Sequence, residues 1–397
     1  MIKAPVKREL IQWACERSRR DPADLAERFP KLEDWQSGDD SPTLKQLEKF
    51  AAATHTPFGY FFLAQPPVET LPIPDFRTLG SARIKRPSPD LLDTIYLCQQ
   101  RQDWYRQHAR LMGEDPRAFV GSATINDSVV ATAAAIRTAL KLDLQERSNL
   151  PTWEDALRRL IEHADHLGVL VMTSGIVASN THRQLDTAEF RGFALSDDLA
   201  PLIFVNGTDT KNGQQFTLVH ELAHLWLGQS ALSDSTPLST YGSLTVEQWC
   251  NAVAAEVLVP LAGFSTSYRR KEAIAVELRR LSRQYKVSSL VILRRMFDAG
   301  GLSRARFNAA FDAELERIMA AMALKKAGGG NFYFTTAARV SPRFARAILA
   351  STWEGRSTFT EAFRLLGCQK VSSLATLGES LGIGPPVSHI RVRKEDE

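Results

Sequence analysis

The spacing of apolar residues predicts that most of the chain is helical. Over residues 6–63 the apolar side chains recur every three or four positions, which is the period of short amphipathic helices. The first part of the chain is therefore expected to be a small all-helical module. Further helical patterns cover 89–112, 126–140, 153–166 and most of the chain after Gln214.

Three runs in the middle of the chain have a different pattern. Residues 168–173, 190–195 and 201–205 are rich in Val, Ile and Phe and are bounded by Gly or Asp, which is typical of buried strands. The sequence therefore predicts an α+β protein that is mostly helical and contains a small sheet.

A proline-rich segment separates the first helical module from the rest. Residues 65–89 contain six prolines and have no helical period, which predicts an extended linker. Four parts are expected: the helical module 1–68, a linker with a connecting helix over 69–118, a domain with the strands over 119–262, and a helical domain over 263–397.

Composition and charge narrow the class of protein. The 397 residues are 44% hydrophobic and 24% charged, and no apolar run is long enough to cross a membrane. The four cysteines form no CxxC pair, and no apolar stretch of a secretion signal follows the first basic residues, so a cytoplasmic location is expected. Residues 261–397 carry a net charge of +11 and the remainder −7, so nucleic-acid binding is possible but expected to be weak.

The strongest chemical signal is an HExxH sequence on a predicted helix. His220 and His224 are four residues apart, so both imidazoles lie on one helix face, where they can bind a single Zn²⁺. Glu221 is placed to act on the water at the metal. The neighbouring residues are apolar nearly all round the helix, so two histidines and a carboxylate are expected to be buried, and a divalent cation would compensate all three.

A catalytic zinc needs a third protein ligand. The candidates are Glu247 and Glu256, which lie about 180° apart on the next predicted helix, with Asp234 in the intervening loop as a minor alternative. We favour Glu247, because Asn251 follows one turn later and can orient a ligand histidine by a hydrogen bond.

The strand that precedes the HExxH helix suggests how a substrate binds. Phe204, Val205 and Asn206 lead directly toward that helix, so we expect this strand to lie at the edge of the sheet beside the metal. An extended peptide could pair with such an edge through backbone hydrogen bonds, which favours a protein substrate. Tyr268, Arg191 and Tyr241 are candidates for stabilising the oxyanion.

With these motifs in view, the chain resembles the ImmA/IrrE family of zinc endopeptidases in its longer form, which is preceded by an XRE-type helix-turn-helix module. The resemblance implies a zincin-like, gluzincin domain over 119–262, with the helix-turn-helix module before it and the basic helical domain after it. It also implies that His220, His224 and Glu247 bind zinc and that Glu221 is the base. The segments that carry it are 44–50 with 61–63, 75–77, 190–193, 203–206, 216–221 and 247–260.

The resemblance implies a cytosolic protease that cleaves a helix-turn-helix repressor or antitoxin and so induces stress, phage or mobile-element genes. The N-terminal module departs from that pattern, because its expected recognition helix, 30–38, carries Glu33 and Asp34, which a phosphate backbone repels. We therefore expect this module to dock a protein. Alternative functions are a DNA-binding regulator with a structural or sensory zinc and a component of a toxin–antitoxin pair. The regulator remains an alternative because two C-terminal segments, 281–297 and 358–381, also have the spacing of a helix-turn-helix. Arg294 and Arg295 are expected to be exposed at the end of the first segment.

Overall fold

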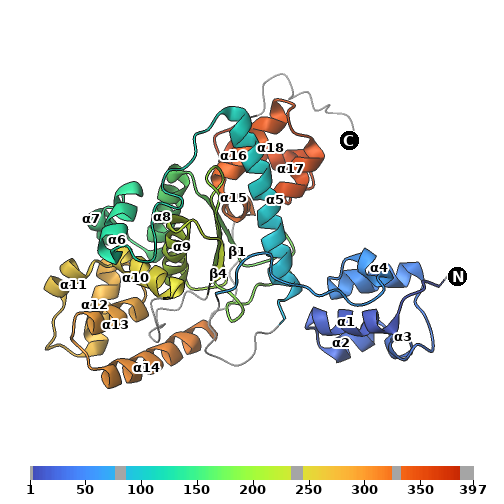
Figure 1. Cartoon of the computed structure of the whole chain (residues 1–397), viewed down its shortest axis with the longest axis horizontal. Helices are drawn as coiled ribbons and strands as arrows, with labels where there is room; N and C mark the ends of the chain where they lie inside the picture. The colour runs from blue at the N-terminus through green and yellow to red at the C-terminus, as the bar shows by residue number, and fades with distance from the viewer. Residues whose placement is uncertain (1–2, 77–85, 234–244, 324–331, 385–397) are drawn as a thin grey trace, which may run out of the picture. The chain divides into compact units, whose positions relative to one another are not determined.

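The chain folds into two compact units. The structure is a computed structural model and describes residues 3–76, 86–233, 245–323 and 332–384 (Figure 1). One unit contains Met1–Pro72 and Leu79–Tyr96, and the other contains Ile73–Thr78 and Leu97–Glu397. The predicted module 1–68 lies within the first unit, whereas the predicted boundary at 262/263 lies inside the second.

The N-terminal unit is a bundle of short helices around an aromatic core. Phe50 is fully buried and meets the rings of Phe29 and Trp35 edge-on, with ring centroids 5.3 and 6.0 Å away. The side chain of Thr43 accepts a hydrogen bond from the backbone of Gln46 and so begins α4. The elements are α1 (Arg8–Ser18), α2 (Pro22–Arg28), α3 (Leu32–Ser37), α4 (Leu44–Thr54) and the 3₁₀ helix η1 (Phe58–Phe62).

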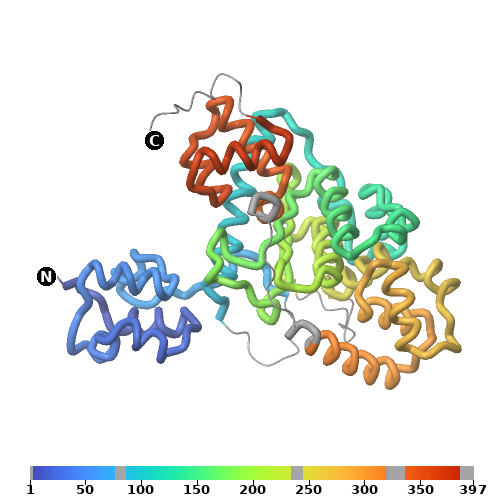
Figure 2. Tube along the Cα trace, turned by 180° about the vertical axis from the view of Figure 1, so that it is seen from behind, coloured from blue at the N-terminus to red at the C-terminus, as the bar shows by residue number. Residues whose placement is uncertain are grey.

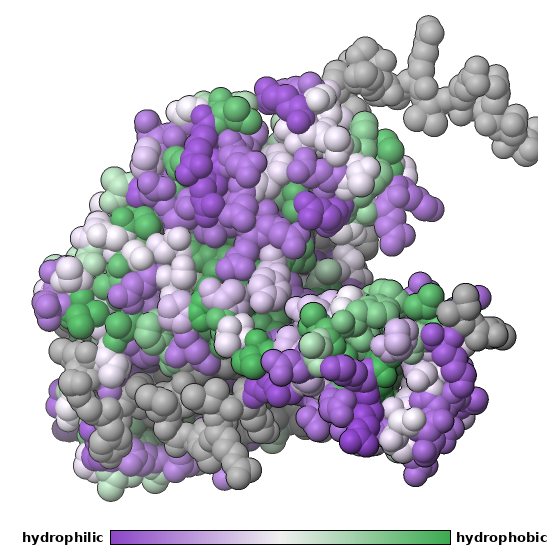
Figure 3. Space-filling view, turned by 45° about the vertical axis from the view of Figure 1, so that its right-hand side comes forward, coloured by the Kyte–Doolittle hydropathy of each residue, from purple (hydrophilic) through white to green (hydrophobic). Residues whose placement is uncertain are grey.

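The surface of this unit is partly apolar. Leu44 at the start of α4 and Phe58, Phe62 and Leu63 around η1 have 38–48% of their surface exposed. Hydrophobic residues are visible beside charged ones on the space-filling view of this unit (Figure 3). The expected recognition helix forms α3, and its Trp35 belongs to the core.

The second unit is built on a mixed sheet with the strand order β1-β3-β2-β4. β1 and β3 are parallel, while β2 is antiparallel to both β3 and β4. The first three strands lie where the sequence predicted them, and the short fourth strand was not predicted. The bounds are β1 (Leu170–Ser174), β2 (Gly192–Leu195), β3 (Leu202–Asn206) and β4 (Ala231–Ser233).

Helices cover the sheet and form one large core with it. Helix α9 (Lys211–Trp226) packs on β2 and β3, and α10 (Val246–Leu258) packs on α9 (Figure 1). This arrangement places α9 between the sheet and α10, which explains why it is buried on all sides. The neighbouring helices are α6 (Val129–Ala139), α7 (Leu144–Asn149), α8 (Trp153–Leu167), α11 (Leu261–Ser267), α12 (Ile274–Tyr285), α13 (Ser289–Asp298) and α14 (Arg304–Ala323).

The last four helices return to the second half of α5 (Pro89–Met112) (Figures 1 and 2). The buried guanidinium of Arg101 on α5 donates to the carbonyl of Leu365, 2.9 Å away, and so joins two segments far apart in sequence. No helix in the described ranges is long and apolar enough to cross a membrane. These four are α15 (Phe332–Val340), α16 (Pro342–Trp353), α17 (Phe359–Leu366) and α18 (Val371–Ser380).

Candidate metal centre

The two histidines of the HExxH sequence meet inside the second unit. Thr210 caps the start of α9 by accepting a hydrogen bond from Gly213, and every residue of the helix from Gln214 to Trp226 is buried. His220 and His224 have no exposed surface, and their Nε2 atoms are 3.2 Å apart. The one-turn spacing therefore brings both imidazoles to one point.

Glu247 on α10 completes the group. Thr245 and Gln248 form a capping box that begins α10, which places Glu247 in its first turn, facing α9. The carboxylate Oε1 lies 3.0 Å from Nε2 of His224, and Oε2 lies 3.2 Å from Nε2 of His220. Within the described ranges, His220, His224 and Glu247 form the group of possible metal ligands whose ligand atoms all lie within 4.8 Å of one another.

This geometry fits a tetrahedral zinc ion. Zinc bonds to nitrogen and oxygen of about 2.1 Å give a tetrahedron with edges of about 3.4 Å. The Nε2 atoms of the two histidines are 3.2 Å apart, within a few tenths of that edge, and each lies 3.0–3.2 Å from one carboxylate oxygen of Glu247. Two nitrogens and a carboxylate are a ligand set that zinc prefers, and three protein ligands leave a fourth position for water or substrate.

Burial and mutual contact determine the charges of these groups. Burial alone would raise the pKa of Glu247, but the two histidines outweigh it and lower the pKa to about 2. Burial by itself would lower the pKa of His220, but contact with Glu247 outweighs burial, so the pKa of His220 is raised. For His224 burial outweighs the contact with Glu247, so its pKa is lowered. Glu247 is therefore the anion of the group.

Glu221 lies beside this group without joining it. It is fully buried, and burial raises its pKa to about 8. Its Oε2 accepts a hydrogen bond from Ser233 at 3.4 Å, and the Ser233 hydroxyl is also 3.2 Å from Nε2 of His224. Glu221 thus differs from Glu247 in its hydrogen-bond partners and in the direction of its pKa shift.

Two residues that sequence reasoning missed position Glu221. Ser233 ends β4, which is too short to give a strand pattern. Gly192 begins β2 where it meets α9: a Cβ there would lie 2.5 Å from the side chain of Thr217, 2.8 Å from the carbonyl of Phe204 and 3.4 Å from Glu221. Only a glycine at position 192 lets α9 lie this close to the sheet. The signal available in the sequence was this glycine between Arg191 and Phe193.

Glu256, the rival third ligand, lies at the other end of α10 and away from the histidines. Its Oε2 accepts a hydrogen bond from Arg295 at 2.9 Å, and its carboxylate also accepts one from the backbone of Leu261 at 3.2 Å. Arg295 was expected to be exposed, and this was wrong: it is 5% exposed because Glu256 and Asp298 hold it inside.

The prediction of β3 as an edge strand was wrong. β3, which contains Phe204, Val205 and Asn206, is paired with β1 on one side and β2 on the other, so no peptide can pair with it. Asn206 is fully buried, and its side-chain amide donates to the carbonyl of Phe190 at 3.1 Å. Its side chain therefore stabilises the chain beside β2.

The edge beside the metal group is β4, and the chain itself pairs with it. Leu232 donates to the carbonyl of Pro74 and accepts from the backbone of Phe76, both at 2.9 Å. The ring of Phe76 stacks on His224 with a centroid distance of 6.1 Å. Residues 74–76, in the middle of the predicted linker, are thus neighbours of the candidate metal site.

The remaining candidates are distributed as follows. Arg191 forms an ion pair with Asp209 at 3.0 Å, and Tyr268 packs against Phe264 with ring centroids 5.5 Å apart. Asn251 lies one turn after Glu247, and neither of its buried amide atoms has a hydrogen-bond partner in the described part of the chain. Asp234, Tyr241 and Arg77 lie outside the described residues.

Comparison with known families agrees with this geometry. Residues 164–297 match the family model of the IrrE N-terminal-like domain, Peptidase M78, and this range contains the HExxH sequence and Glu247. Residues 340–380 match a domain of unknown function, DUF8813. No curated protein matches the chain. The first match supports a metallopeptidase-type function for the second unit.

Proposed function

We propose that the protein is a zinc-dependent endopeptidase. The observation that carries the proposal is the convergence of His220, His224 and Glu247 at separations of 3.0–3.2 Å inside a domain that matches a peptidase family. In this proposal the three residues hold zinc, and Glu221 is the catalytic base.

The chemistry follows from the charges of the residues. When bound, zinc polarises the carbonyl of the scissile peptide and lowers the pKa of a water molecule to about 7. Glu221 takes a proton from the attacking water and delivers it to the amine nitrogen that leaves. Glu221 is fully buried beside the ligand group, which shields its carboxyl from bulk water during this transfer. Ser233 keeps the carboxyl in place through its hydrogen bond.

Asn251 is proposed to orient His220. The Nδ1 of His220 and both amide atoms of Asn251 are buried, and none of them has a partner elsewhere in the described chain. Buried polar groups are costly without hydrogen bonds, so a bond from the Nδ1–H of His220 to the Asn251 oxygen would satisfy both. Such a bond fixes the tautomer in which Nε2 is free for the metal.

The substrate is proposed to be a helix-turn-helix repressor or antitoxin in the cytoplasm, whose cleavage derepresses stress, phage or mobile-element genes. The support is the resemblance to the ImmA/IrrE family and the match over 164–297. The exposed apolar residues of the N-terminal unit, Phe58, Phe62 and Leu63 among them, favour docking of a protein there. Duplex DNA is expected to bind this unit weakly.

The test is the substitution Glu221→Gln. The amide keeps the shape of the side chain and removes the base, so we expect cleavage of a repressor encoded beside this gene to fall by about 10²–10⁴-fold. Zinc content by mass spectrometry and the thermal unfolding midpoint are expected to remain those of the unchanged protein. Cleavage at the original rate by zinc-loaded Glu221→Gln would contradict the proposal, and a fourth protein ligand on the zinc would favour the regulator.

A further inference from the structure

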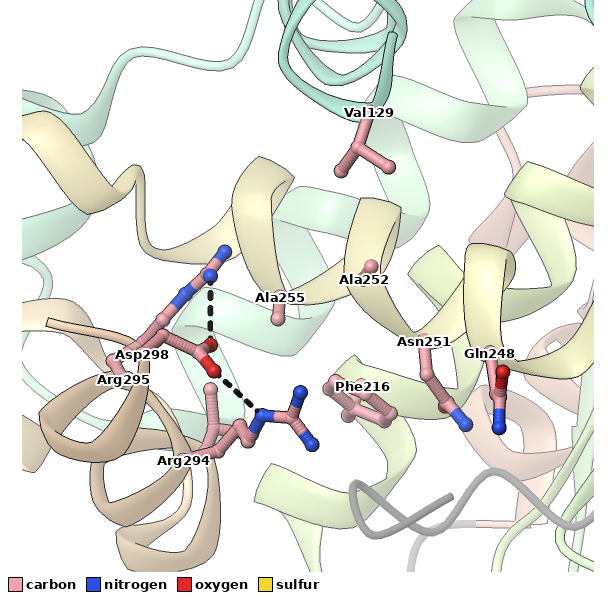
Figure 4. Close-up of a pocket in the computed structure, with 10 residues that line it drawn as sticks. Val129, Phe216, Gln248, Asn251, Ala252, Ala255, Arg294, Arg295 and Asp298 are labelled. Atoms are coloured by element: carbon pink, nitrogen blue, oxygen red, sulfur yellow. Dashed lines mark hydrogen bonds and ion pairs between the residues drawn. The ribbon is translucent and has the colours of Figure 1, made fainter. Parts of the chain in front are cut away.

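A pocket of about 80 Å³ opens next to the candidate metal group. Phe216 lies one turn before His220 on α9, with ring centroids 6.4 Å apart, and Asn251 lies one turn after Glu247 on α10. Both Phe216 and Asn251 line the pocket, and α13 closes its far side (Figure 4). A peptide whose backbone lies at the metal group would therefore place a neighbouring side chain in this pocket.

Five of the ten residues that line the pocket are apolar, and the other five, Gln248 among them, are polar or charged. Phe216, Ala252, Ala255 and Val291 form the walls, which suit the methylene groups of a side chain. Asn251 is 8% exposed, and its amide nitrogen has no acceptor within the described ranges. With the amide oxygen proposed to accept from His220, this nitrogen is the group that can donate to a polar atom of a ligand.

The charged side of the pocket is positive. Arg294 and Arg295 line it with a single carboxylate, Asp298, and both arginines donate to that carboxylate, at 2.8 and 3.2 Å. Arg295 is also held by Glu256, whereas 26% of the Arg294 side chain is exposed. Figure 4 shows the Arg294 guanidinium extending toward Phe216, with the Asn251 amide on the other side of that ring.

We propose that this pocket selects a substrate residue next to the scissile bond and that it prefers glutamate. The two methylene groups of glutamate would contact Phe216 and the alanines, and its carboxylate would accept hydrogen bonds from Arg294. Leucine fits the walls but offers Arg294 no acceptor beyond Asp298, and lysine adds a further cation beside the two arginines. Arg294 is thus a specificity-determining residue, and the inference rests on the proposed endopeptidase function.

Binding of short peptide hydroxamates to the zinc-loaded full-length protein tests this pocket. The hydroxamate group chelates zinc, and the residue on its amino or carboxyl side is varied among glutamate, glutamine, leucine and lysine. In one of these two series we expect glutamate to bind about tenfold more tightly than glutamine, because a hydrogen bond to a charged partner is worth more than a neutral one. Arg294→Gln is expected to abolish this preference and to leave zinc content unchanged.

Arg279→Gln is the matched control. Arg279 is an exposed arginine on α12, its guanidinium donates to the carbonyl of Ala275 in the same helix, and it does not line the pocket. Its substitution should retain the glutamate preference. Hydroxamates that bind without preferring glutamate, or a preference that survives Arg294→Gln, would overturn the pocket assignment and leave the endopeptidase standing. Failure of every hydroxamate to bind the zinc-loaded protein would instead overturn the metal-centre function and this inference with it.

Discussion

The two ends of α10 carry buried glutamates in opposite circumstances. Glu247 in the first turn is 7% exposed, and Glu256 in the last turn is 6% exposed. Glu256 contacts the permanent cation of Arg295 and accepts a hydrogen bond from the backbone of Leu261. Glu247 contacts two imidazoles, which carry a charge only when they are protonated.

This difference shows how a structural carboxylate is distinguished from a ligand. Moving a carboxylate out of water costs several kcal/mol unless a cation and hydrogen bonds compensate it. Arg295 supplies that compensation to Glu256 within the fold. At Glu247 the protein supplies two imidazoles instead of a permanent cation. In the proposed function, one end of α10 is complete as a protein and the other is completed by a metal ion.

The largest effect should come from removing each carboxylate in turn. Glu256→Ala leaves Arg295 with only Asp298 in a buried position, so we expect the free energy of unfolding to fall by about 3 kcal/mol while zinc content is retained. Glu247→Ala should lose zinc and lower the unfolding free energy of the metal-free protein much less. Zinc analysis and denaturant unfolding of the same preparations measure both.

Conservative variants serve as controls for that pair. Glu256→Gln keeps the volume of the side chain and removes its charge. It should therefore lose a large part of the unfolding free energy that Glu256→Ala loses, and this comparison separates the contribution of the ion pair from that of packing. If Glu256→Ala loses zinc while Glu247→Ala retains it, the roles of the two ends of α10 are the reverse of those proposed here.

A second effect concerns stability in the presence and absence of zinc. Zinc at 100 times its dissociation constant should stabilise the folded protein by about 2.7 kcal/mol, because it binds the assembled site of the native state. A chelator should therefore lower the unfolding midpoint of the unchanged protein and of Glu256→Gln alike. The midpoint of Glu247→Ala should not respond, and a chelator effect as large as that of the unchanged protein would contradict the ligand role of Glu247.

Sequence reasoning predicted which polar side chains meet better than it predicted which strands pair. The one-turn spacing of His220 and His224 and the stripe of Glu247 on α10 depend on local helix geometry, which a sequence pattern records directly. The place of β3 between two other strands depends on pairing with residues far away in the chain, which periodicity does not record. The unbroken apolar run 202–205 indicates that both faces of the strand are buried, but burial of the faces does not tell whether a strand lies at an edge.

The parts that sequence missed have the same physical origin. Ser233 and the segment 74–76 acquire their roles through β4, which has three residues and forms only beside β2. Arg295 was expected at the surface because its position on the helix says nothing of Glu256, 39 residues earlier, to which it is bound. The periodicity of a sequence predicts which residues share a face of a helix. Which residues pack against that face is determined by the tertiary fold.

The smallest effect should come from Asn251, which lies on the same helix between the two glutamates. If its amide oxygen accepts from His220, Asn251→Ala should weaken zinc binding by about 10-fold, as is usual when a group that orients a ligand histidine is removed. Asn251→Asp retains an acceptor for that hydrogen bond and should restore most of the affinity. Competition with a chromophoric chelator measures both affinities, and the unfolding midpoint of each zinc-free variant separates metal binding from stability. Unchanged zinc affinity in Asn251→Ala would remove Asn251 from the metal centre, and its unpartnered amide would then belong to the neighbouring pocket alone.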